Sequence, residues 1–177
     1  MELIKVPLDR IPALIGKQGR TRKMLEKKLQ LKLSVSDEGE VKLEGEPLQE
    51  FLGREVVKAV ACGFPVRTAL KLLDDSCTLK VVNLREWGGG SPKGLQRVKA
   101  RLIGSEGKTK RLIEEIAEAD LCIHGHTVAI IGDLETIDIA VQAVFKLLEG
   151  ASHGAVYGFL ERARHSFKEK RLKEGFW

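Results

Sequence analysis

The chain has 177 residues and a formal net charge of +5, and 43% of its residues are hydrophobic. This length allows one ordinary domain or two small ones, and the hydrophobic fraction excludes wholesale disorder. No apolar run approaches the roughly 18 residues of a membrane span, and the N-terminus shows no secretory signal peptide.

The first half of the chain predicts a mixture of strands and helices. Alternating apolar residues indicate strands, and apolar residues three or four positions apart indicate helices. Two glycines, Gly16 and Gly19, interrupt the first helical stretch. In chain order, we expect a strand at 3–6, a short helix at 7–15, a helix after Gly19, strands at 31–35 and 41–43, and helices at 48–61 and 64–73.

The second half predicts the same order of elements. The halves meet near residues 74–76, and the glycine-rich stretch 88–92 is expected to be a flexible connection. A basic tail follows the second half. We expect strands at 78–84, 121–123 and 127–131, helices at 95–103, 108–119 and 134–149, and a helical tail at 156–173.

One motif occurs twice, at an offset of 88 residues. Residues 14–26 and 102–114 both read Leu-Ile-Gly-x-x-Gly-basic-Thr-basic-basic-apolar-apolar-Glu. The charge follows the same repeat, because 1–35 holds nine Lys/Arg against three Asp/Glu and 77–115 holds nine against four. Acidic stretches follow both basic ones. A duplicated domain explains both patterns, with copies at 1–75 and 76–150 and a basic helical tail at 151–177.

The Gly-x-x-Gly loops are suited to binding a phosphate backbone. Glycines allow a sharp turn and let another chain approach closely, because they carry no Cβ. Each loop opens a helix, whose first N–H groups and dipole favour an anion. The Lys and Arg residues around the loops add long-range attraction. Glu106 in the second loop opposes phosphate.

The order strand, helix, Gly-x-x-Gly, helix, strand, strand, helix resembles two type I KH domains in tandem, over residues 2–75 and 77–150. The resemblance implies an α+β fold in which each copy packs a three-stranded sheet against three helices, with a C-terminal helix added. It also implies that each loop clamps about four single-stranded nucleotides against an aliphatic floor on the next strand. The RNA-binding residues expected on this basis are Ile15, Gly16, Lys17, Gln18, Gly19, Arg20, Arg22, Lys23 and Leu33 in the first copy, and Lys99, Arg101, Ile103, Gly104, Ser105, Glu106, Gly107, Lys108, Lys110, Arg111 and Ile123 in the second.

Two stretches of the second copy resemble one family more than KH proteins in general. Residues 87–92 read Trp-Gly-Gly-Gly-Ser-Pro, and 97–109 combine basic residues with the glycine loop. With the two-domain layout and the basic tail, they are similar to the archaeal form of the partner-of-Nob family of small-subunit assembly factors. The resemblance implies binding near the 3′ end of small-subunit ribosomal RNA, beside the Nob endonuclease. We expect a monomer.

No catalytic or metal-binding arrangement is visible, so we expect neither an enzyme nor a cofactor. Lys108-Thr109 resembles the end of a nucleotide-binding P-loop, but Leu102 stands where that motif needs its first glycine. His124 and His126 have no further metal ligands nearby. The three cysteines form no CxxC pair, which favours a reduced, cytoplasmic protein. The alternative is a protein-interaction scaffold that uses a surface such as 51–64.

Overall fold

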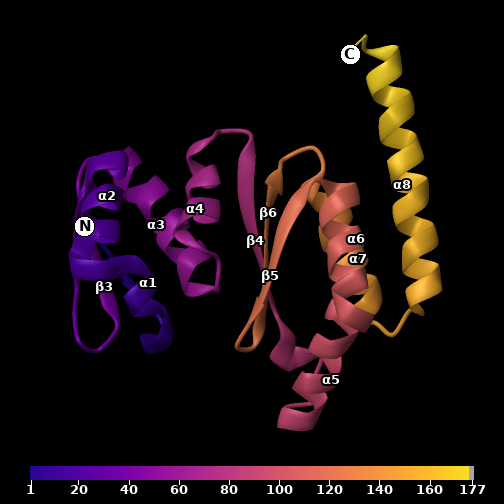
Figure 1. Ribbon diagram of the computed structural model, residues 1–177, viewed down its shortest axis with the longest axis horizontal. Coiled ribbons are helices and arrows are strands. Elements are labelled where there is room, and N and C mark those ends of the chain that lie inside the picture. The colour runs from indigo at the N-terminus through magenta and orange to yellow at the C-terminus, as the bar shows by residue number, and fades with distance from the viewer. Residues whose placement is uncertain (176–177) are drawn as a thin grey trace. The chain divides into compact units, whose positions relative to one another are not determined.

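The computed structural model describes residues 1–175 and divides the chain into two compact units, with the division between Leu79 and Lys80 (Figure 1). The chain forms two three-stranded sheets, one from each half of the sequence, together with helices. The fold is therefore α+β, as predicted. No helix in the described part of the chain is both long enough and apolar enough to cross a membrane.

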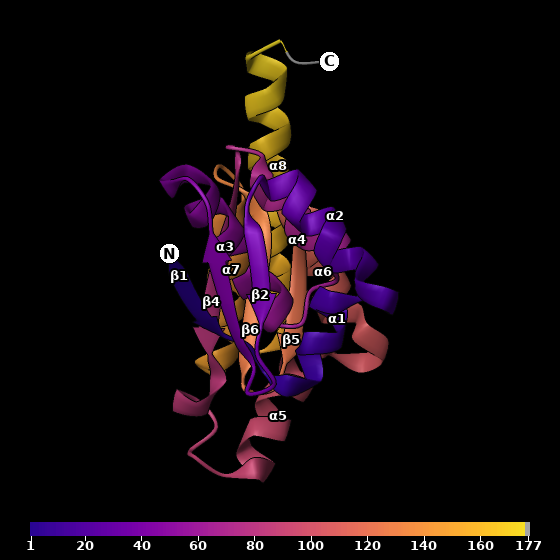
Figure 2. The ribbon, with the colours of Figure 1, turned by 90° about the vertical axis from the view of Figure 1, so that its left-hand side faces the viewer.

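The elements of the first unit are β1 (Glu2–Lys5), α1 (Ile11–Ile15), α2 (Arg20–Leu29), β2 (Lys32–Val35), β3 (Glu40–Glu44), α3 (Pro47–Ala61) and α4 (Val66–Ala69). The sheet has the order β1-β3-β2, with Leu33 opposite Leu43 in the register of β2 and β3. Figure 2 looks onto this unit and shows α2 alongside β2, with α1 next to it. Leu14, Leu25 and Val57 are fully buried between the sheet and the helices.

The later elements are β4 (Cys77–Asn83), α5 (Pro92–Ile103), α6 (Lys108–Ala117), β5 (Ala119–His124), β6 (Thr127–Asp133), α7 (Ile137–Leu148) and α8 (His153–Lys173). Their sheet has the equivalent order, β4-β6-β5. Val128 and Ile130 of its central strand are buried in one cluster with Leu102, Ile113 and Val144 from three helices. One face of the sheet and these helices thus share a core.

The C-terminal helix α8 is partly built into the second unit. Val156 and Leu160 are fully buried in the same core, and α8 packs against α6 and α7. The helix begins at His153, three residues before the predicted start, because the Ser152 hydroxyl accepts a hydrogen bond from the Ala155 N–H and caps it. The last two residues of the predicted tail, 176–177, lie outside the described part of the chain.

Helix ends account for most other differences from the predicted elements. Helix α5 begins at Pro92 rather than 95, because the Ser91 hydroxyl caps it and proline suits its first turn. Helix α6 ends at Ala117 rather than 119, because Glu118 adopts a left-handed conformation and the chain enters β5. The helix expected at 64–73 is split into α4 and a 3-10 turn, Leu70–Leu73.

Candidate nucleic-acid interface

The two Gly-x-x-Gly loops have the same backbone path. Gly16 has φ 68° and ψ 178°, and Gly104 has φ 73° and ψ 179°. The residue before the final glycine also matches, with φ 53° at both Gln18 and Glu106. In each loop the final glycine donates its N–H to the carbonyl oxygen of the first, at 3.2 Å. The sequence repeat is thus a structural repeat at the predicted sites.

The first glycine of each loop is required by a threonine five residues later. A Cβ on Gly16 would lie 2.0 Å from Thr21 Oγ1, and a Cβ on Gly104 would lie 2.1 Å from Thr109 Oγ1. Both glycines also have positive φ, where a side chain is strained. The repeated threonine therefore packs directly under the loop, a role that the sequence analysis did not assign to it.

The last glycine of each loop faces open space. Gly19 and Gly107 have φ 73° and 74°, and a Cβ on either would meet no atom within 4 Å in the described part of the chain. Each directly precedes a ten-residue helix, α2 or α6. A sugar-phosphate chain can therefore approach the loop where the helix presents its first N–H groups.

A glutamate on the loop helix ties that helix to the next strand in both units. Glu26 Oε1 accepts the Leu33 N–H at 3.0 Å, and Glu114 Oε1 accepts the Leu121 N–H at 2.8 Å. The two glutamates are the last residues of the repeated motif. These hydrogen bonds set the spacing between the loop helix and the strand expected to form the cleft floor.

The side chain of Leu33 is buried, although it was expected on the cleft surface. Its side chain is 2% exposed and lies in the core, so it offers almost no area to a base. Leu33 and Val35 lie on the same face of β2, the face that the helices cover. Val35, the last residue of the strand, is only half-buried. Of the other predicted floor residues, Ile15 and Ile123 are half-buried and Ile103 is 39% exposed.

Arg101, predicted to contact nucleic acid, makes structural hydrogen bonds within the second unit. Its guanidinium donates to the carbonyl oxygens of Leu147 and Ala151, at the end of α7. In the first unit, Arg10 makes the equivalent pair of bonds to Val60 and Phe64, at the end of α3. Charge alone does not distinguish such arginines from free ones, because their partners are backbone carbonyls at least 46 residues away.

The first loop has more cations available than the second. Lys17, Arg20 and Lys23 are exposed and have no carboxylate partner among the described residues. Arg22 is half-buried, and its Nε has no partner within the described chain. Lys17 lies within the loop, and the three others lie in the first four residues of α2.

The second loop carries cations that are partly neutralised. Lys110 forms an ion pair with Glu114 at 3.0 Å, and Arg111 donates to the Glu106 carbonyl oxygen at 3.1 Å. Lys108 is exposed with no carboxylate partner among the described residues, whereas Lys99 is half-buried. Ser105 and Glu106 are exposed at the tip. Phosphate attraction should therefore be weaker at this loop.

Two arginines of the basic tail form ion pairs within the second unit. Arg164 pairs with Glu115 and Arg171 with Glu118, both at 2.9 Å. The bond and the charge of Glu118 raise the pKa of Arg171 above its usual range. Two ion pairs therefore join α8 to α6 and to the residue that follows it.

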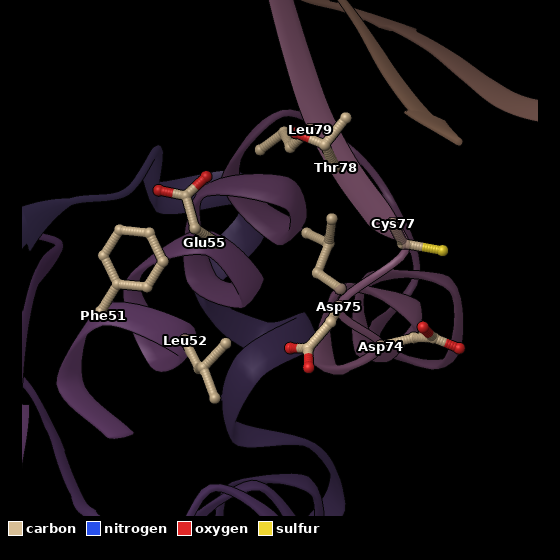
Figure 3. Close-up of a pocket in the computed structure, with 9 residues that line it drawn as sticks. Phe51, Leu52, Glu55, Asp74, Asp75, Cys77, Thr78 and Leu79 are labelled. Atoms are coloured by element: carbon tan, nitrogen blue, oxygen red, sulfur yellow. The ribbon is translucent and has the colours of Figure 1, made fainter. Parts of the chain in front are cut away.

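A separate hollow of about 190 Å³ lies in the first unit (Figure 3). Phe51, Leu52 and Glu55 of α3 line one side of it, and the segment from Asp74 to Leu79 lines the other. The Phe51 ring is 50% exposed and lies under the Arg54 guanidinium, 4.9 Å from its carbon. Within residues 1–175, no group of three or more His, Cys, Asp or Glu residues is arranged to hold a metal ion.

Comparison with known sequences places the chain among KH-domain proteins. The family model described as a eukaryotic-type KH domain (KH-domain type I) matches residues 78–165. KH domain-containing protein MJ0443 of Methanocaldococcus jannaschii is 40% identical over 98% of this chain and 78% of its own length. Pre-rRNA-processing protein PNO1 of Chaetomium thermophilum is 30% identical over 81% of this chain, which spans only 58% of that relative.

Solved structures match nearly the whole chain. Dim2p of Pyrococcus horikoshii is 39% identical with a TM-score of 0.84, over 91% of this chain and 98% of that chain. The same organism's Dim2p in a complex with a/eIF2alpha and rRNA is 38% identical with a TM-score of 0.85, over 93% and 94%. A protein of unknown function from Aeropyrum pernix, APE0754, is 35% identical with a TM-score of 0.90, over 98% and 95%.

Proposed function

The chain belongs to the PNO1/Dim2p family of KH-domain proteins, and we propose that it captures single-stranded RNA in two Gly-x-x-Gly clefts. The single observation that carries this proposal is the identical path of two loops 88 residues apart. Each loop ends in a glycine that faces open space and begins a helix. The RNA backbone would lie across the loop, and the bases would lie toward the adjacent strand.

We propose that the first unit is a KH domain as well as the second. The matched family model covers residues 78–165, which form the type I KH domain of the second unit. The first unit has the same order of strands in its sheet, the same loop and the same glutamate-to-strand bond. We therefore propose KH domains at 1–75 and 76–150, followed by a basic tail at 151–177.

The relatives suggest which RNA the clefts receive. The Pyrococcus Dim2p structure contains rRNA, and the fungal relatives are named for pre-rRNA processing. We propose that this chain acts in assembly of the small ribosomal subunit and binds the 3′ region of its rRNA. We further propose that the protein is a cytoplasmic monomer without enzymatic activity. It would work beside the Nob endonuclease.

Added negative charge at the loops tests the clefts in the full-length chain. Lys17→Asp with Gln18→Asp, and Ser105→Asp with Glu106→Asp, should together weaken binding to a single-stranded RNA oligonucleotide at least about tenfold, as measured by fluorescence anisotropy. Both Gln18 and Glu106 have positive φ, which aspartate tolerates better than most residues. Undiminished affinity would contradict the cleft proposal.

A matched control separates the loop from the charge of its helix. Lys27→Asp with Lys28→Asp places a larger charge change in the last turn of the same helix, α2. We expect this control to weaken binding less than the first-loop pair, because neither lysine borders the loop. An equal or larger loss in the control would show general electrostatic attraction instead of a cleft.

The hollow beside Phe51 supports a second candidate, a docking surface for a protein partner. An exposed aromatic ring beside apolar Leu52 is a common interface feature. The salt dependence of complex formation distinguishes the two functions. RNA capture should weaken steeply between low and physiological salt, whereas an apolar interface should not.

A further inference from the structure

Helix α8 bonds to both sides of the second Gly-x-x-Gly loop. On the side where the loop enters α6, Tyr157 Oη lies 2.8 Å from Thr109 Oγ1, within hydrogen-bond distance. On the side where α5 ends, a ring nitrogen of His153 lies 2.9 Å from the Arg101 carbonyl oxygen. These two contacts come from consecutive turns of α8.

The Tyr157 contact reaches the threonine on which the loop rests. Thr109 is fully buried, and its Oγ1 lies where a Cβ of Gly104 would be. A buried hydroxyl with one good partner keeps one rotamer, because turning away would leave it unsatisfied. The Tyr157 hydroxyl therefore holds the Thr109 side chain under the first glycine of the loop.

Tyr157 also lies beside the cation at the start of α6. The Lys108 ammonium lies over the Tyr157 ring, 5.4 Å from its centroid. Lys108 is the first residue of α6, directly after the open glycine Gly107. The ring thus restricts where this charge points, by a cation–π contact at the edge of the cleft.

The His153 contact fixes the other end of the loop. The Arg101 carbonyl belongs to the last turn of α5, where carbonyl groups lack partners within the helix. The same residue's guanidinium bonds to the end of α7. The end of α5 is therefore held by α7 through the Arg101 side chain and by α8 through its backbone.

The first loop lacks this support in the described chain. Thr21 occupies the same place under Gly16 as Thr109 under Gly104. In the first unit, the helical segment that follows α3 is much shorter than α8 and spans only residues 66–73. The sequence has a single tyrosine, Tyr157, so no tyrosine hydroxyl is available to bond to Thr21. The two loops thus share one backbone path, but only the second has a tyrosine bonded to its threonine.

We propose that Tyr157 is a positioning residue for RNA binding at the second cleft. By holding Thr109 and Lys108, it keeps the second loop in its phosphate-receiving geometry before RNA arrives. A loop ordered in advance loses less conformational freedom on binding, and so binds more tightly. This inference rests on the proposed RNA-binding function of the cleft.

The test uses the full-length chain with the first cleft disabled by Lys17→Asp and Gln18→Asp. In that background, Tyr157→Phe should weaken single-stranded RNA binding about three- to tenfold, the range expected for one hydrogen bond. Tyr157→Leu should weaken it further, because it also removes the ring beneath Lys108. Thr109→Val should match Tyr157→Phe, the two together should cost no more than either alone, and Thr109→Ser should retain affinity.

A control on the same helix separates positioning from stability. Val156→Ala removes buried methyl groups from α8 without touching the loop, and it should lower the melting temperature but leave RNA affinity unchanged. Amide hydrogen exchange at residues 105–108 should become faster in Tyr157→Phe and stay unchanged in Val156→Ala. An equal loss of affinity in Val156→Ala would overturn the inference.

The outcomes distinguish this inference from the function on which it rests. If Ser105→Asp with Glu106→Asp abolishes binding in the same background while Tyr157→Phe leaves affinity intact, the positioning role is wrong and the cleft stands. If the loop pair itself has no effect, the second cleft does not bind RNA and the proposed function fails there.

Discussion

The carboxylate of Glu114 accepts the backbone N–H of Leu121 at 2.8 Å and so joins α6 to β5. The same oxygen of Glu114 also forms an ion pair with Lys110 at 3.0 Å. We predict that Glu114→Ala lowers the free energy of unfolding by about 1–3 kcal/mol, the cost of losing a hydrogen bond to a charged group. Urea denaturation measures the change.

The neighbouring glutamate provides the control. Glu115 is more exposed and pairs with Arg164 on the surface, so Glu115→Ala should cost less than about 1 kcal/mol. Glu114→Gln keeps an oxygen acceptor and should fall between the two. Equal stability of Glu114→Ala and Glu115→Ala would contradict the assigned role of the Glu114 bond.

The two glycines of the second loop should respond differently to alanine. In Gly104→Ala, the new methyl would meet Thr109 Oγ1 at a backbone angle that already disfavours a side chain. In Gly107→Ala, the methyl enters open space, and the left-handed conformation alone should cost about 1–2 kcal/mol. We therefore predict a larger loss of unfolding free energy in Gly104→Ala.

Gly107→Ala should also weaken RNA binding. Gly107→Ala places a methyl on the open side of the loop, so its affinity should fall by more than its modest loss of stability explains. Anisotropy at a temperature where both variants remain folded measures this effect. Unchanged affinity in Gly107→Ala would show that RNA does not approach that side.

The local features of the site are those that the sequence predicts well. Glycines at the same two positions of a repeated motif indicated both loops, because a position with a left-handed backbone conformation favours glycine. The strand and helix order followed from the spacing of apolar residues. These signals depend on neighbours within a few positions along the chain.

Features that depend on distant partners could not be predicted from the sequence. The charge of Arg101 indicated a phosphate contact, but carbonyls at the end of α7 bind its guanidinium. Alternation placed Leu33 on one face of its strand without showing that the helices cover that face. No local signal connected Tyr157 to Thr109, which is 48 residues earlier.

The two clefts should differ in their dependence on salt. The first loop has three exposed cations without carboxylate partners in the described chain, whereas Lys110 in the second is paired with Glu114. With one cleft disabled at a time, the logarithm of affinity against that of salt should be steeper for the first cleft by about 1–2, at roughly 0.7 per phosphate contact. A steeper slope at the second cleft would contradict this assignment of free charges.

The segment between the two halves contains a carboxylate that should titrate abnormally. The Ser76 backbone N–H and hydroxyl both donate to Asp74, and they hold the pKa of that carboxyl below its usual range. Because folding favours the charged form, its stabilising effect is complete above the unfolded pKa and is lost as pH falls through the folded value. Ser76→Ala should raise the pKa of Asp74, as an NMR titration would show, and an unchanged pKa would contradict the role of the hydroxyl.

RNA titration followed by NMR is the most direct test of two Gly-x-x-Gly clefts. A single-stranded RNA oligonucleotide is added to the ¹⁵N-labelled full-length chain, and the backbone amide shifts are followed. We predict that the largest changes fall at residues 16–20 and 104–108, the two loops and the first residues of their helices. Changes confined to α3 and its surroundings, with both loops unmoved, would contradict RNA capture in these clefts.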